Sequence, residues 1–134
     1  MINSDISLKN IKKESSTVKK SALALFIGFC TFIIILTISS FIIMNISIPV
    51  EYLFVFVLIA SGMSAISCST AACMLHKHRL LLLSMIISLI LSITEFLIIL
   101  CFNDVRLSYY VYFLFPIVIF CSFISSAVIL NIKK

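Results

Sequence analysis

Four long apolar stretches constrain this chain more than any other feature of its sequence. They cover residues 21–44, 52–75, 80–102 and 110–130. Each has about the 20 residues that an α-helix needs to cross a hydrocarbon layer about 30 Å thick. Only 11% of the residues are charged, whereas a soluble domain carries about 25%. The sequence therefore predicts an integral membrane protein, whose first partner is the lipid bilayer.

The links between the four stretches are short, at residues 45–51, 76–79 and 103–109. Helices joined by such links run antiparallel to one another. We therefore expect an all-α, up-down four-helix transmembrane bundle over residues 21–134, preceded by a disordered basic tail at residues 1–20. The first stretch is longer than the apolar core of a signal peptide, about 7–15 residues, so we expect it to remain in the membrane.

The distribution of positive charge predicts the orientation. Nine of the ten Lys and Arg residues lie in the tail, in the 76–79 link and at the C-terminus, and Arg106 is the exception. Because the number of spans is even, those three segments lie on one side. The positive-inside rule then places both termini in the cytoplasm, at the plasma membrane. The tyrosines agree, because all four lie at the predicted opposite boundary: Tyr52, Tyr109, Tyr110 and Tyr112.

Small residues dominate part of the second stretch, "ASGMSAISCSTAAC" at 60–73. Membrane helices attach to one another by close packing, which small residues permit. We expect the second helix to be central in the bundle. Its packing residues, with two from the first stretch, are Ala24, Gly28, Ser61, Ala65, Cys68 and Ala72. Packing within the chain is the simpler interpretation, and a homodimer contact or a sliding surface is the functional one.

One acidic residue interrupts the third stretch. Ser84, Ser88, Ser92 and Glu95 follow spacings of 4, 4 and 3 residues, so they lie within roughly 80° of arc on a helix. A polar stripe inside a membrane helix normally faces protein or water. The candidate intramembrane polar site is therefore this stripe, with Glu95 at its end.

Three roles for Glu95 stay open. It is a protonatable group for proton or cation coupling, a structural hydrogen-bonding or ion-paired residue, or a group that reaches the outer interface or a partner protein. The partners expected at its depth are Thr37, Ser39, Ser40, Tyr112 and Arg106. Pro116 lies at about the same depth and predicts a kink, because proline cannot donate to the carbonyl four residues earlier.

No constellation of residues for catalysis is visible in the sequence. No serine has a paired histidine and acid on the same side of the membrane, and no phosphate loop or zinc spacing is present, so we expect no enzyme, cofactor or metal. His76 and His78 flank Lys77, which favours a solvated turn over a metal site. The odd number of cysteines fits no disulfide framework. The basic tail lacks interleaved aromatic residues, which argues against a nucleic-acid partner.

The run "SGMSAISCSTAAC" (61–73), the basic turn "HKHR" and the following Ser84 and Ser88 resemble the YrzE-like family of small bacterial membrane proteins. The resemblance covers residues 21–100. In that family these zones are richer in glycine, where this chain has serine, alanine and cysteine. The resemblance implies a four-helix bacterial plasma-membrane protein without an assigned activity, and it transfers no functional residue.

Two functional hypotheses follow. The first is a non-enzymatic membrane protein that acts through helix–helix contacts, as an accessory subunit of a partner membrane protein or as a homo-oligomer. The alternative is a small proton- or cation-coupled transporter or channel that uses Glu95. One observation bears on both hypotheses: whether the side chain of Glu95 faces the bundle interior, the lipid or a second copy of the chain.

Overall fold

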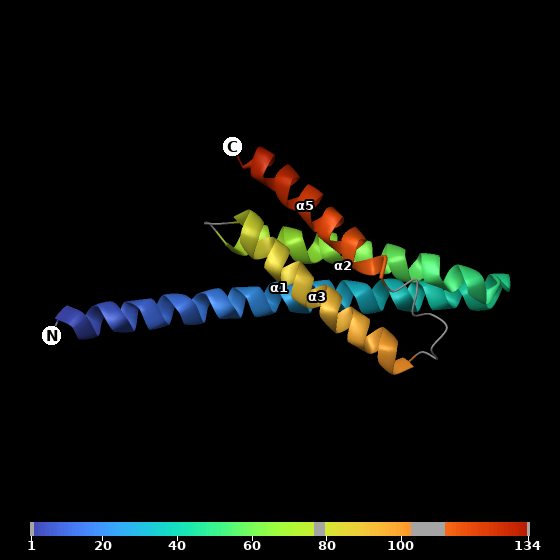
Figure 1. Cartoon of the computed structure of the whole chain (residues 1–134), viewed down its shortest axis with the longest axis horizontal. Helices are drawn as coiled ribbons and strands as arrows, with labels where there is room; N and C mark the ends of the chain where they lie inside the picture. The colour runs from blue at the N-terminus through green and yellow to red at the C-terminus, as the bar shows by residue number, and fades with distance from the viewer. Residues whose placement is uncertain (1, 77–79, 103–111, 134) are drawn as a thin grey trace.

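The computed structural model describes residues 2–76, 80–102 and 112–133, which form four α-helices and no strand (Figure 1). The directions of the helices alternate along the chain in Figure 1, as the short links predicted. The expectation of an all-α helical bundle is therefore confirmed. The elements are α1 (Ile2–Ile46), the short 3-10 helix η1 (Val50–Tyr52), α2 (Leu53–Leu75), α3 (Leu80–Phe102) and α5 (Leu114–Ile132).

The bounds of α2 and α3 agree with the apolar stretches within one residue. Helix α5 begins at Leu114, four residues later than the predicted span, and ends two residues beyond it. Pro116 is therefore the third residue of α5, where a backbone N–H would have no intrahelical partner in any case. The kink predicted at Pro116 is wrong for this reason.

Helix α1 differs most from the prediction, because it begins at Ile2 and includes the tail that was expected to be disordered. Residues 1–20 contain no glycine or proline, and a helix already formed in the span extends at little cost. With 45 residues, α1 is about 68 Å long. Its first part projects beyond the other helices (Figure 1), with exposed side chains from Ser4 to Ser16.

Helix α2 is the centre of the bundle and packs against α1, α3 and α5. This confirms the prediction from its small residues. Its buried face contains only small side chains, which lets the neighbouring backbones approach closely. The buried residues of α2 are Ala60, Ser61, Gly62, Ser64, Ala65, Cys68, Ser69, Ala72 and Cys73.

Small and polar side chains are common in the interior of the bundle, whereas large apolar side chains are common on its surface. Many buried side chains are alanine, serine or cysteine, whereas large apolar side chains such as Phe26, Phe41 and Phe120 are 65%, 71% and 66% exposed. Soluble proteins rarely expose apolar surface so widely. Within the described residues, four helices are long and apolar enough to cross a membrane. This is the pattern of a multi-pass membrane protein.

Candidate functional site

A cluster of five serine hydroxyls joins α2, α3 and α5 in the bundle interior. The Oγ atoms of Ser84 and Ser126 are 2.6 Å apart, and those of Ser69 and Ser126 are 2.8 Å apart. Ser88 and Ser122 form a further pair at 2.6 Å. All five side chains are at most 1% exposed. We call these five residues the hydroxyl cluster, and its hydrogen bonds link the three helices.

Glu95 lies on α3 beyond the hydroxyl cluster and has no exposed surface. Its Oε1 atom lies 2.6 Å from the hydroxyl oxygen of Ser64 on α2, within hydrogen-bond distance. Ser64 Oγ also lies 2.8 Å from the carbonyl oxygen of Ser61. The carboxyl group therefore faces protein, and its contact with Ser64 crosses the α2–α3 interface.

Two polar oxygens at this level lack a hydrogen-bond partner among the described residues. They are Oε2 of Glu95 and Oγ of Ser92, one helical turn away on α3. Both side chains are completely buried. Because buried polar groups are nearly always paired in folded proteins, this place in the structure requires a chemical explanation.

Of the partners expected for Glu95, the four that lie within the described residues form no hydrogen bond with it. Thr37 is exposed and donates to the carbonyl of Ile33 in its own helix, and Tyr112 is 67% exposed. Ser39 is buried and Ser40 is exposed, but Glu95 bonds to Ser64 instead. Arg106 lies outside the described residues.

Sequence reasoning missed Ser64 as a hydrogen-bonding partner, although a signal was present. Ser64 lies 12 residues before His76, and Glu95 lies 16 residues after Arg79. Residues at similar distances from a short link reach similar depths on two antiparallel helices. Sequence reasoning also missed Ser69, whose hydroxyl pairs with that of Ser126. The four residues of the predicted stripe, Ser84, Ser88, Ser92 and Glu95, are all buried, and their functional role stays a prediction.

The six predicted packing residues are also buried. A Cβ atom built on Gly28 would lie 2.7 Å from Cβ of Cys68 and 3.0 Å from Cδ2 of Leu91, so α1 approaches α2 and α3 closely there. Ala24, Cys68 and Ala72 share one core cluster with Ile87 and Leu91. These small faces are occupied by contacts within the chain.

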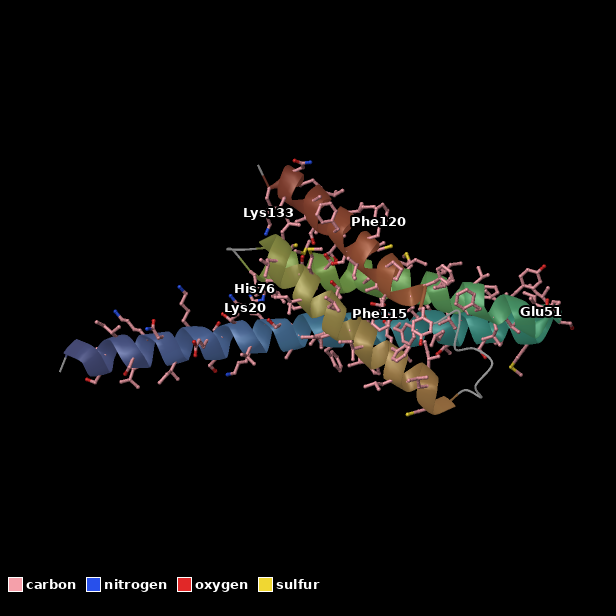
Figure 2. All side chains as sticks on the ribbon, in the orientation of Figure 1. Lys20, Glu51, His76, Phe115, Phe120 and Lys133 are labelled. Carbon is pink, nitrogen blue, oxygen red and sulfur yellow. The ribbon has the colours of Figure 1, made fainter. Side chains whose placement is uncertain are left out.

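Cationic and polar groups gather where α1 leaves the bundle. Nε2 of His76 lies 3.4 Å from the Ser21 hydroxyl, and Lys133 Nζ donates a hydrogen bond of 2.7 Å to the carbonyl of Cys73. Burial and the nearby charge of Lys20 lower the pKa of His76 from its usual value of 6.5. Figure 2 shows Lys20, His76 and Lys133 at this end and Glu51 at the other. His78 lies outside the described residues.

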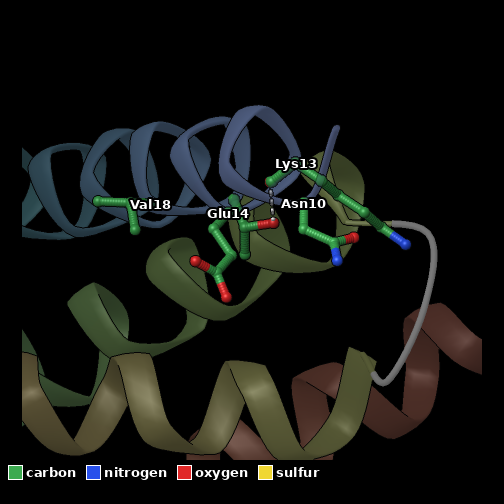
Figure 3. Close-up of a pocket in the computed structure, with 5 residues that line it drawn as sticks. Asn10, Lys13, Glu14 and Val18 are labelled. Carbon is green, nitrogen blue, oxygen red and sulfur yellow. Dashed lines mark hydrogen bonds between the residues drawn. The ribbon is translucent and has the colours of Figure 1, made fainter. Parts of the chain in front are cut away.

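The first part of α1 carries a shallow hollow lined by four polar residues and one valine (Figure 3). The hydroxyl of Thr17 donates a 3.0 Å bond to the carbonyl of Lys13 beside it. The hollow is lined by Asn10, Lys13, Glu14, Thr17 and Val18.

In the described part of the chain, no group of three or more His, Cys, Asp or Glu residues is placed to hold a metal ion.

No family model matches this chain, and no curated protein or solved structure matches it either. The resemblance to the YrzE-like family therefore stays a prediction.

Proposed function

We propose that this chain is a non-enzymatic plasma-membrane protein that acts through helix–helix contacts, as an accessory subunit or a homo-oligomer. The apolar surface and the serine-rich interior of the bundle support a location in the bilayer. Lipid tails accept the exposed isoleucine, leucine and phenylalanine side chains, and most buried hydroxyl groups of the serine-rich interior are hydrogen-bonded within the chain. These two properties support a bundle that spans the membrane.

The charges support an orientation with both termini in the cytoplasm. Lys20, His76 and Lys133 lie at one end of the bundle, whereas Glu51 lies at the other (Figure 2). Cytoplasmic ends of spans carry an excess of Lys and Arg. Protease accessibility of tags at the two chain ends, measured in spheroplasts and in inverted vesicles, tests this orientation. Digestion of either tag from the outside would contradict it.

The placement of α1 is the observation that carries the helix-contact proposal. The small-residue faces are used within the chain, so a partner would contact another surface. Helix α1 packs mainly on α2, with a smaller contact on α3. Its opposite face exposes Phe26, Ile34 and Phe41, and its first part projects without packing against another helix. The apolar part of α1 is the least buried of the four candidate spans, at 17%, and therefore offers a surface for a second membrane helix.

Size measurement of the protein in a mild detergent and in nanodiscs tests this proposal. We expect a homo-oligomer or a retained membrane-protein partner. A cysteine introduced at Ile34 should form crosslinks, whereas one at buried Phe32 should not, in a background without the five native cysteines. A compact monomer without a retained partner would contradict the proposal.

The buried carboxyl group favours a second candidate, a small proton- or cation-coupled transporter or channel. Ionisable residues inside a membrane bundle often mark ion pathways, and Glu95, at the end of the polar stripe, faces the interior. This candidate predicts that Glu95→Gln abolishes pH-dependent flux in liposomes while the protein still folds. Unchanged flux in that variant would eliminate it.

A further inference from the structure

Glu95 is chemically isolated within the bundle. It is the only Asp, Glu, Lys, Arg or His residue in α2, α3 and α5 and in residues 21–46 of α1. A buried carboxylate needs a cation or several donors to offset the loss of water. The described residues give it one hydroxyl, and the titratable group that interacts with it is the thiol of Cys68 on α2.

Ser64 has more hydrogen-bond acceptors within reach than hydrogens to donate. Its hydroxyl oxygen is within hydrogen-bond distance of two acceptors, the Ser61 carbonyl at 2.8 Å and Glu95 Oε1 at 2.6 Å. A serine hydroxyl has only one hydrogen to donate. If Glu95 were a carboxylate, this single hydrogen would have to serve both short oxygen–oxygen contacts.

We propose that Glu95 holds a proton and forms an internal proton-binding site with Ser64. The carboxylic acid donates from Oε1 to Ser64 Oγ, and the Ser64 hydroxyl donates to the Ser61 carbonyl. Each short contact then contains one hydrogen. The unpartnered Oε2 becomes the carbonyl oxygen of a neutral acid, and burying it costs much less than burying a charged oxygen.

Proton binding is thereby linked to the packing of α2 against α3. Release of the proton to water leaves a buried carboxylate that competes with the Ser61 carbonyl for the single Ser64 hydrogen. The ionised form is stabilised by separation of the two helices, because separation admits water to the carboxylate. The proton-binding site does not depend on whether the chain acts through helix contacts or as a transporter.

Infrared difference spectroscopy of the full chain in nanodiscs, with isotope-labelled glutamate, tests the site. At neutral pH we expect the carbonyl band of a protonated carboxyl group. The band should be absent from Glu95→Gln and unchanged in Glu51→Gln, because Glu51 is exposed. Ser64→Ala should shift the band, because the acid loses its acceptor, whereas Ser67→Ala should not, because Ser67 donates within its own helix.

Three results would overturn the proposal. The first is a wild-type spectrum at neutral pH with carboxylate bands only. The second is loss of the acid band on addition of sodium at constant pH, which would identify a cation site. The third is a carboxylate band that becomes an acid band in Arg106→Gln, which would identify an ion pair. If Glu95→Gln fails to fold, the wild-type band and its shift in Ser64→Ala still decide the question.

Discussion

The Ser64 hydroxyl of α2 lies 2.6 Å from Oε1 of Glu95 on α3, and neither side chain has any exposed surface. This contact joins two consecutive antiparallel helices at the only acidic residue in either of them. It gives the polar stripe of α3 a defined partner helix. The bundle therefore depends on hydrogen bonds at a place where a soluble protein would have leucine or valine.

Ser64→Ala should destabilise the protein by about 0.5–2 kcal/mol, because hydrogen bonds between membrane helices contribute energies of this size. Unfolding in mixed detergent micelles measures the difference. Ser67→Ala on the same helix is the matched control, since Ser67 donates only to the carbonyl of Met63. Equal effects of the two substitutions would show that the contact with Glu95 contributes nothing.

The two glycines should respond differently to alanine. In Gly28→Ala the new Cβ would meet Cβ of Cys68 at 2.7 Å, so α1 must move away from α2. We expect a loss of about 1–3 kcal/mol, as for other overpacked cores. In Gly62→Ala the nearest atom is Cys121 Sγ at 3.6 Å, and alanine favours the helix by about 1 kcal/mol. Thermal unfolding in detergent should distinguish the two variants. Unchanged stability of Gly28→Ala would contradict the close approach of α1 to α2.

The hydroxyl cluster should show energetic coupling between its members. Ser84 and Ser126 lie on different helices with their hydroxyl oxygens 2.6 Å apart. In a double-mutant cycle with alanine, we expect an interaction energy of about 0.5–1.5 kcal/mol. The same cycle for Ser84 and Ser67 should be additive. Additivity in both cycles would mean that the hydroxyl cluster contributes no net stability.

Stability should fall as the pH decreases below 6.5, the usual pKa of histidine. Burial and Lys20 lower the pKa of His76 in the folded chain, so between the two pKa values the unfolded chain binds more protons. The free energy of unfolding therefore decreases with falling pH across this window. Unfolding measured at a series of pH values should show this slope. The slope should be weaker in His76→Gln, and an equal slope would exclude His76 as its source.

Deletion of residues 2–16 should leave the unfolding free energy within about 0.5 kcal/mol, as for other surface changes. These residues belong to α1, and the side chains from Ser4 to Ser16 are exposed. Unfolding of the shortened chain in detergent micelles measures the effect. A large loss of stability would show that the projecting helix packs against a second molecule or folds back on the bundle.

The helical bundle could be predicted from the sequence, because length and apolarity alone decide which segments form membrane helices. The ends of α2 and α3 follow directly from the apolar runs. The tail was harder to predict, since its polar composition suits either a solvated coil or the extension of an existing helix. The prediction at Pro116 failed because it required the helix to include Tyr112, whereas α5 begins at Leu114.

The sequence by itself determined the class of the fold, the central place of α2 and the face of α3 that carries Ser84, Ser88, Ser92 and Glu95. These follow from apolarity, side-chain size and the helical period, which are local properties. Only the tertiary structure decided that Ser64 is the partner of Glu95 and that Ser69 joins Ser84 and Ser126. Such pairings depend on the rotation and depth of one helix relative to another, and those are set by the packing of all the helices together.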